Sequence, residues 1–248
     1  MKRFRFHILC LALLACSAVA VFCAGPIRVD DPVEGQKLAR EIRSVVPAEE
    51  AKINGVLRIS RPGSEPREIP FESRVVIGSG KWSSVYAAKM PDGTTETLTV
   101  HHFPDKPNEY EWRRGNSVQK FDGRAATNSF AGSDFALMDL GMEFYHWPGQ
   151  VLVYREMRKG RGCDVLLSIP GQTNLYSRVL SWIDQESRAQ GAPGLIMAEA
   201  YDRHGKLLKE FEVRDMKKVD GRWQVGEMEL RNRQTRTATK LQFHFDGK

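Results

Sequence analysis

The sequence predicts a mainly β protein with a few helices, of the α+β class. We expect an incomplete antiparallel β-barrel, or strongly curved sheet, that helices close. Most of the chain after residue 50 consists of short runs rich in β-branched and aromatic residues, separated by turn signals. The C-terminal runs carry their apolar residues on one face, and a sheet of this kind has to cover that face. One clear helix and the segment 128–141 are available to do so.

The first 24 residues have the layout of an export signal. Three basic residues among the first five precede an apolar run that extends to about residue 24. The tripeptide "AVA" fits the small-x-small rule for cleavage. The stretch "LLAC", which ends at Cys16, resembles a bacterial lipobox and would make Cys16 a lipid-carrying N-terminus. We therefore expect an exported, periplasmic protein, soluble or anchored to a membrane through Cys16, with an uncleaved apolar anchor as the less favoured alternative.

Residues 25–248 are expected to form a single domain, because no linker, repeat or low-complexity tract divides them. The formal charge of +6 falls to +3 once the three basic residues of the signal are removed. This weak positive charge is not clustered, which argues against a nucleic-acid partner. Three of the four cysteines lie in the signal, so Cys163 has no partner for a disulfide within the domain. We expect a strand that buries it.

The first expected element of the domain is a helix from about Pro32 to Val45. Leu38 and Ile42 recur at helical spacing, and Pro47 ends the pattern. Strands follow in runs such as "GVLRIS" and "TETLTVHHF". The Asp-Gly pair within "MPDGTTE" predicts a hairpin turn, because both residues tolerate a positive φ.

The stretch "VVIGSGKWSSVYAAKM" resembles a kinase glycine-rich loop, with Gly78 and Gly80 at the matching spacing. The rest of the kinase pattern is missing from the sequence. The next strand carries no lysine, Ser83 replaces the third glycine, and neither an H-R-D loop nor a D-F-G site follows. The P-loop spacing fails as well. We interpret the stretch as a turn between two strands and expect no nucleotide.

Five successive strands are predicted between residues 177 and 245, joined by short turns into an antiparallel meander. Leu241 and Phe243 share one face of the last strand, and Phe211 and Val213 share one face of the third. In the fourth strand the apolar parity changes beside Gly226. This change predicts a β-bulge that bends the strand.

Metal binding and catalysis have little support in the sequence. His101 and His102 are adjacent on a predicted strand and point to opposite faces, and the other histidines are scattered. No G-x-S-x-G motif occurs. Asp134 is interpreted as the N-cap of the helix "FALMDL", and Asp139 as a solvent-facing carboxylate. We expect no catalytic residue, metal or cofactor, with a hydrolase as a third-ranked alternative.

Two blocks of the chain, Gly132–Leu140 and Ser177–Phe243, resemble the LolA-like superfamily of outer-membrane lipoprotein-sorting proteins. The first contains "GSDFALMDL", which is similar to the branch with a G-S-D-F-x-x-x-D-L segment. The second has "WID", "YDRHGK" and "KKVDGRW" in the family's order, followed by a basic and threonine-rich strand. The chain departs from the family pattern after "WID", where "QESRAQGAPG" precedes the next strand, and no latch arginine of the family can be matched.

The resemblance implies a non-enzymatic periplasmic carrier or binder of lipoproteins or other lipids. Its apolar cavity would shelter acyl chains from water. Each methylene group that leaves water contributes about 0.8 kcal/mol to the binding free energy. Membrane proteins that load or receive the cargo would be its partners.

The segment Gly132, Ser133, Asp134 and Phe135 would form part of a lid, or simply a turn and a core helix. The candidate lipid-binding residues, proposed as a face although core packing is the favoured role for any single one, are Trp182, Phe211, Val213, Trp223, Val225, Leu241 and Phe243. The main alternative function is an exported envelope sensor or protein-binding module with a filled interior and an exposed apolar patch.

Overall fold

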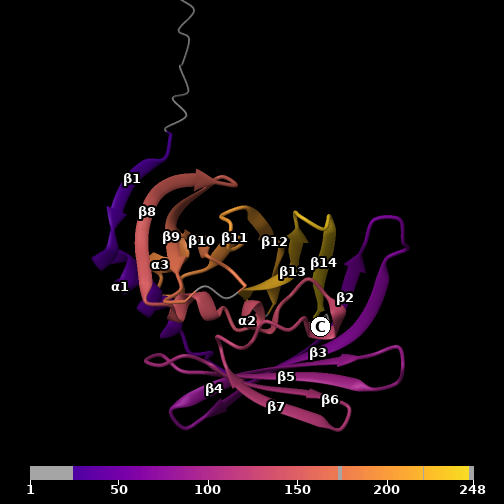
Figure 1. The fold of residues 1–248 in the computed structure, drawn as a ribbon. Helices are drawn as coiled ribbons and strands as arrows, with labels where there is room; N and C mark the ends of the chain where they lie inside the picture. The colour runs from indigo at the N-terminus through magenta and orange to yellow at the C-terminus, as the bar shows by residue number, and fades with distance from the viewer. Residues whose placement is uncertain (1–24, 173–174, 220, 246–248) are drawn as a thin grey trace, which may run out of the picture.

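The computed structural model describes residues 25–172, 175–219 and 221–245 (Figure 1). The expected export signal and Cys16 lie outside the described residues. Within the described ranges, no helix combines the length and the apolar composition needed to cross a membrane.

The described part of the chain forms one antiparallel sheet of fourteen strands. The strands are β1 (Ile27–Asp31), β2 (Ala51–Ser60), β3 (Arg67–Gly78), β4 (Lys81–Lys89), β5 (Thr95–His102), β6 (Glu109–Arg114), β7 (Ser117–Asp122), β8 (Gly149–Arg158), β9 (Arg161–Ile169), β10 (Arg178–Asp184), β11 (Leu195–Tyr201), β12 (Leu207–Val219), β13 (Arg222–Asn232) and β14 (Thr237–His244). Their order in the sheet is β1-β8-β9-β10-β11-β12-β13-β14-β2-β3-β4-β5-β6-β7.

The helices of the described ranges are short. They are α1 (Pro32–Arg43), α2 (Leu137–Leu140) and α3 (Gln185–Ala189), with 3₁₀ turns η1 (Phe130–Gly132) and η2 (Glu143–His146). The carboxylate of Asp31 caps α1 by accepting hydrogen bonds from the backbone N–H groups of Val33 and Glu34, both at 2.9 Å. The predicted helix is confirmed, and it ends at Arg43, two residues before the expected end.

The sheet curls around a chain segment that crosses its concave face. Because β14 pairs with β2, the chain's C-terminal meander and its first hairpins form one continuous surface. Figure 1 shows β8–β14 arching on one side and β3–β7 on the other, with α2 between them. We call residues 123–148, which carry η1, α2 and η2, the inner segment. The expected curved sheet wrapped around helices is confirmed.

The sheet does not close into a barrel, so β1 and β7 are its free edges. β1 has five residues and an irregular register between Arg28 and Asp31, where Asp30 adopts a φ of 53°. β7 has six residues, and most of its side chains, including Lys120, are exposed.

The local predictions for turns and bulges are confirmed. The five-strand meander is β10–β14, and a register shift skips Gly226 in β13. A second shift skips Arg214 on the facing strand β12. Gly93 and Gly80 have φ values of 81° and 74° in the β4–β5 and β3–β4 turns. The kinase-like stretch is therefore a hairpin.

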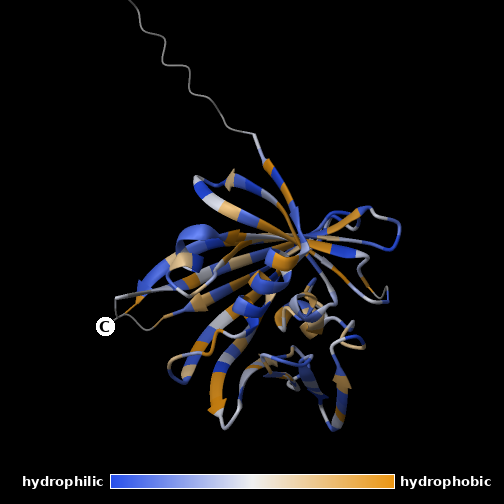
Figure 2. Ribbon diagram, turned by 90° about the vertical axis from the view of Figure 1, so that its left-hand side faces the viewer, coloured by the Kyte–Doolittle hydropathy of each residue, from blue (hydrophilic) through white to orange (hydrophobic). Residues whose placement is uncertain are grey.

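Both faces of the sheet carry buried apolar residues, but the cluster on the concave face is much larger than the one on the opposite face. Orange and blue alternate along the strands in Figure 2, as the pleat requires. The large core lies on the concave face. A small cluster on the opposite face contains Val153, Cys163, Val165, Trp182 and Met197. Arg158 of β8 covers part of this cluster, with its guanidinium 5.2 Å from the centre of the Trp182 ring and in contact with the Met197 sulfur. Cys163 is fully buried, as predicted.

Gly35 sets how closely α1 packs against β8. A Cβ at residue 35 would lie 2.6 Å from the backbone nitrogen of Leu152 and 2.7 Å from the carbonyl oxygen of Gln150. We predict that Gly35→Ala lowers the free energy of unfolding by at least 2 kcal/mol, although alanine is intrinsically the better helix former. The measurement is urea unfolding followed by tryptophan fluorescence.

Val33→Ala, at an exposed position of the same helix, is the matched control and should change stability by less than about 0.5 kcal/mol. A Gly35→Ala protein as stable as the wild type would contradict the close packing of α1.

Candidate functional site

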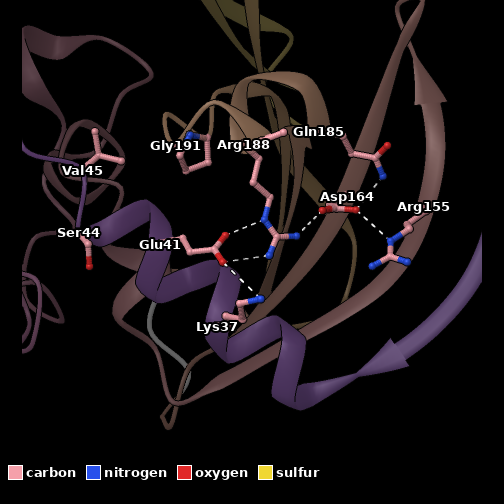
Figure 3. A pocket seen from close by; sticks show the side chains of 11 residues that line it. Lys37, Glu41, Ser44, Val45, Arg155, Asp164, Gln185, Arg188 and Gly191 are labelled. Atoms are coloured by element: carbon pink, nitrogen blue, oxygen red, sulfur yellow. Dashed lines mark hydrogen bonds and ion pairs between the residues drawn. The ribbon is translucent and has the colours of Figure 1, made fainter.

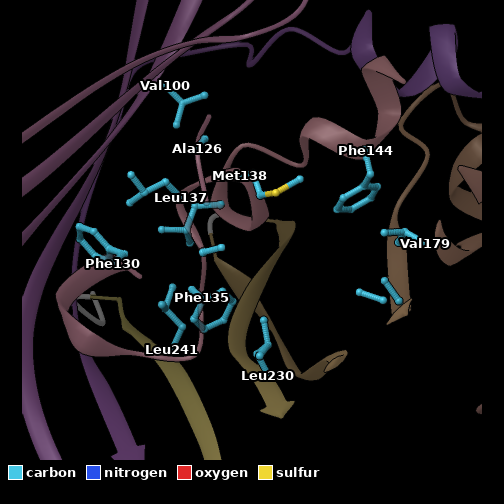
Figure 4. Close-up of a cluster of buried hydrophobic side chains, with 14 of the residues drawn as sticks. Val100, Ala126, Phe130, Phe135, Leu137, Met138, Phe144, Val179, Leu230 and Leu241 are labelled. Carbon is cyan, nitrogen blue, oxygen red and sulfur yellow. The ribbon is translucent and has the colours of Figure 1, made fainter. Parts of the chain in front are cut away.

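The inner segment fills the concave face with apolar side chains. Figure 4 shows Phe130, Phe135, Leu137 and Met138 extending from it, with Leu230 and Leu241 of the sheet nearby. Phe135 and Leu137 are almost fully buried. The segment therefore takes the place that a second layer of helices would occupy in a larger protein.

Polar groups tie one end of the inner segment to β14. The Asp134 carboxylate accepts hydrogen bonds from the hydroxyl groups of Thr237 and, at 2.8 Å, Thr239. The backbone N–H of Asp134 donates to the Thr239 hydroxyl at 3.0 Å. The expectation that Asp134 is a helix N-cap is wrong, because α2 starts three residues later with Ala136 at its N-cap.

Asp139 ties the centre of the inner segment to the C-terminal meander. Its carboxylate forms an ion pair with Lys209 of β12 at 2.8 Å and accepts a hydrogen bond from the Tyr176 hydroxyl at 2.7 Å. The Asp139 and Lys209 side chains are only 11% and 9% exposed. Asp139 also accepts from the backbone N–H of Ala136, so it caps α2 from within. The expectation of a solvent-facing carboxylate is wrong.

Glu143 ties the other end of the inner segment to β6. It is buried, and its carboxylate accepts a hydrogen bond from the Tyr110 hydroxyl at 3.1 Å. Close by, the Asn108 side-chain amide donates to the Gly141 carbonyl at 2.9 Å. Burial raises the pKa of Glu143 from about 4.5 to about 7, and the hydrogen bonds from Tyr110 and Asn108 offset only part of this effect.

The space left between the inner segment and the meander is small. A cavity of about 40 Å³ is lined mainly by apolar side chains, together with Asp139 and Lys209, and it is bounded on the sheet by Ala198 and Ala200. Small-molecule sites usually occupy about 300–1,000 Å³. This cavity is therefore too small for an acyl chain, and the vacant acyl-chain space that the sequence led us to expect is not found between the inner segment and the meander.

The candidate lipid-binding residues separate into three groups. Leu241, Phe243, Phe211 and Val225 pack in or against the core on the concave face, and Phe211 also borders the small cavity. Val213 is half-buried beside the β12 bulge.

Both tryptophans of the candidate set lie away from the interior. Trp182 faces the opposite side of the sheet, where its indole N–H donates to Glu156 at 2.5 Å. Trp223 is 67% exposed. The assignment of Trp182 to the concave face is corrected, because Trp182 has the parity opposite to its buried neighbours Val179 and Ile183. Trp223 has the same parity as Val225 but lies beyond the end of the core.

The lid motif is a turn followed by a core residue. Gly132 adopts a φ of 64°, and its carbonyl accepts a hydrogen bond from Arg61 at 3.2 Å. The Ser133 hydroxyl accepts from the backbone N–H of Phe135 at 3.2 Å.

A charged groove of about 750 Å³ lies between α1, α3 and β9. Figure 3 shows Arg188 at its centre, pointing at Glu41 and Asp164. Its guanidinium binds Glu34 and Glu41 of α1, both at 2.6 Å, and Asp164 of β9 at 2.5 Å. Burial alone would lower the pKa of Arg188, but the three carboxylates raise it above its ordinary value.

The charges of this groove neutralise one another, so it clamps α1 to the sheet. Asp164 is almost fully buried and also accepts hydrogen bonds from Arg155 and Gln185. Sequence reasoning missed Arg188. It lies in the "QESRAQGAPG" stretch, and the insertion itself was the signal that could have pointed to it.

The described residues contain no group of three or more His, Cys, Asp or Glu side chains that could hold a metal ion. Contacts within the protein explain why the His102 side chain is buried. Its ring forms a hydrogen bond with the Ser84 hydroxyl at 2.9 Å and stacks on the Trp82 ring. Burial lowers the pKa of His102 to about 3, so the ring is neutral.

Solved structures with the same fold include three with closely matching extents. A DUF1329 family protein from Desulfovibrio piger has a TM-score of 0.70 at 20% identity, over 87% of this chain and 92% of that one. A putative outer membrane lipoprotein-sorting protein domain from Vibrio parahaemolyticus has a TM-score of 0.69 at 22% identity, with the same coverage. A LolA superfamily protein from Nitrosomonas europaea has a TM-score of 0.60 at 15% identity, over 88% and 93%. The chain thus has the LolA-like fold that the sequence resemblance predicts.

Comparison with protein-family models gives a match over more than half of the chain. A family model with the description "Uncharacterized protein" matches residues 114–245. No curated protein matches the chain in sequence.

Glu143 should leave a measurable mark on the pH dependence of stability. Between pH 4.5 and 7 the folded protein keeps a proton on Glu143 that the unfolded chain has released, so rising pH favours unfolding. We predict that Glu143→Gln gains stability relative to the wild type between pH 4.5 and 8, by up to roughly 3 kcal/mol. Urea unfolding at several pH values measures this difference.

His102 and His146, whose pKa values burial lowers to about 3 and about 4, shift stability in the opposite direction. They do so equally in both proteins, so the difference isolates Glu143. Glu65→Gln, at an exposed position, is the control and should follow the wild type. A pH-independent difference for Glu143→Gln would contradict the raised pKa.

Proposed function

The chain belongs to the family of uncharacterized proteins matched over residues 114–245 and has the LolA-like fold, and from these premises we propose that it is a non-enzymatic periplasmic carrier or binder of lipid acyl chains. Its cargo would be lipoproteins or other lipids of the cell envelope. The structural relative from Vibrio parahaemolyticus bears the name of a lipoprotein-sorting domain, which supports this direction.

One observation carries the proposal: the apolar concave face is covered by a single chain segment rather than by the sheet itself. The inner segment makes polar contacts with the sheet at Asp134, Asp139 and Glu143. Between these points its contacts are apolar side chains on an apolar sheet. Moving the segment outward would expose a continuous surface suited to hydrocarbon.

The size of the cavity decides how capture would work. About 40 Å³ cannot hold an acyl chain, so the guest has to displace side chains of the inner segment. Each methylene that the guest buries contributes about 0.8 kcal/mol, and each one that the segment exposes costs a similar amount. The net binding free energy is then the difference between the apolar burial that the guest gains and the apolar burial that the inner segment loses. Because these two quantities are similar, the protein could release its guest as well as capture it.

The small size of the cavity supports the alternative function, an envelope sensor or protein-binding module, more strongly than the sequence alone does. An envelope sensor or other protein-binding module was expected to have a filled interior and exposed apolar residues. The packed interior and the exposed Trp223 fit that expectation. Direct measurement of lipid uptake therefore separates the two functions.

Ala198 gives the sharpest test of the carrier proposal. It is buried and borders the small cavity, so Ala198→Leu would occupy the space where an acyl chain has to start entering. We predict saturable binding of a fluorescent fatty acid to residues 25–248, and at least a tenfold loss of affinity in Ala198→Leu. Fluorescence titration measures both values, and organic extraction with mass spectrometry identifies co-purified lipid.

Ala87→Leu, on the half-buried outer side of β4, adds the same volume away from the interior and should bind like the wild type. Circular dichroism verifies that each variant is folded. Absence of saturable binding by the folded wild type would refute the carrier function in favour of the protein-binding module, and full binding by Ala198→Leu would refute the interior site.

A further inference from the structure

The hairpin of β12 and β13 extends beyond its neighbours on both sides. β12 pairs with β11 only as far as Glu212, and β13 pairs with β14 only from Glu227 onward. Between these points the two strands pair only with each other. We call the hairpin segment 213–226, of which the structure describes residues 213–219 and 221–226, the projecting ribbon. The bulges at Arg214 and Gly226 lie at its base.

The projecting ribbon carries the most exposed tryptophan of the protein. Trp223 is 67% exposed, whereas the other four tryptophans of the sequence are buried or half-buried. Trp223 pairs with Lys218, and Met216, which is 43% exposed, pairs with Val225. Paired residues share a face, and so do residues two apart on a strand. One face of the ribbon therefore presents an indole, a thioether and an ammonium group together.

The charge of the ribbon is positive. Its sequence contains four basic and two acidic residues. Arg214 is neutralised by Glu212 and Glu229 at the base, whereas Lys217 and Lys218 near the tip are exposed. Lys218 lies on the face of Trp223, and Lys217 lies on the opposite face, where its ammonium group is 6.0 Å from the centre of the Phe245 ring. An exposed aromatic ring beside lysines is the composition found at membrane–water interfaces: the ring lies at the headgroup level, and the ammonium groups reach anionic headgroups.

We propose that the projecting ribbon docks the protein on the surface of an anionic phospholipid bilayer. Trp223 and Met216 enter the boundary between headgroups and acyl chains, Lys218 binds headgroup phosphates beside them, and Lys217 reaches phosphates from the opposite face of the ribbon tip. The ribbon's exposed apolar surface consists of two side chains, which is small for a protein interface of about 800 Å² per partner. Binding at a membrane interface increases with the apolar area buried and with the attraction of basic groups to anionic lipids, and the ribbon supplies both.

This docking does not depend on the proposed carriage of acyl chains, because Trp223, Met216 and Lys218 lie outside the concave core, and only the base of the ribbon, at Val225, packs against it. A protein that only binds another protein at its surface would also be brought to the membrane by it. The two proposals can therefore fail separately.

The test is co-sedimentation of residues 25–248 with vesicles of phosphatidylglycerol and phosphatidylcholine, and with vesicles of phosphatidylcholine alone. We expect binding to the anionic vesicles that weakens with added salt, and little binding to the neutral ones. A blue shift of tryptophan fluorescence on binding should accompany it, and it should be absent in Trp223→Phe.

Variants locate the docking surface. Trp223→Ala should weaken binding at least fivefold, and Lys217→Glu combined with Lys218→Glu at least tenfold. The matched control reverses two exposed lysines elsewhere, Lys89→Glu with Lys120→Glu, for the same change in net charge. Fatty-acid uptake in solution should be unchanged in Trp223→Ala, and vesicle binding should be unchanged in Ala198→Leu.

No binding to anionic vesicles would overturn the proposal. Equal losses in the ribbon and control charge variants would also overturn it, because the attraction would then come from net charge alone.

Discussion

The structure depends on one constraint: a long antiparallel sheet with an apolar face must keep that face out of water. The chain meets it by curling the sheet around residues 123–148, so that a single segment buries Phe135 and Leu137 against both halves of the sheet. Other features follow from this arrangement. The bulges bend the C-terminal meander, and α1 packs closely on β8 through Gly35.

Polar groups in this fold position segments, while apolar groups provide the burial. Asp134, Asp139 and Glu143 fix the inner segment at separate points, and Arg188 fixes α1 in the same manner. Buried ion pairs contribute little net stability because desolvation offsets their attraction. They do make other positions of the inner segment and α1 unfavourable, because in those positions each buried carboxylate would lose its hydrogen-bond or ion-pair partner. The polar contacts therefore fix where the inner segment lies, and its apolar side chains supply the burial.

Local features were predictable from the sequence, and long-range partners were not. The helix after Asp31, the meander, the bulge at Gly226 and the burial of Cys163 depend on residues close together in the chain. The roles of Asp134 and Asp139 depend on strands more than 60 residues away. Trp182 could not be assigned to a face without knowing the register of its neighbours. The exposure of Trp223 depends on where the neighbouring strands β11 and β14 end. The residue pattern of β13 itself carries no information about those ends.

The two free edges of the sheet have a consequence for the behaviour of the protein at high concentration. An unpaired strand can template a copy of itself, and an open sheet with two regular edges could polymerise head to tail. Here β1 is short and kinked at Asp30, and β7 is short and carries Lys120. Neither edge offers a straight ladder long enough to recruit another molecule. An unclosed sheet can therefore stay dispersed without the closure that a complete barrel uses to achieve the same end.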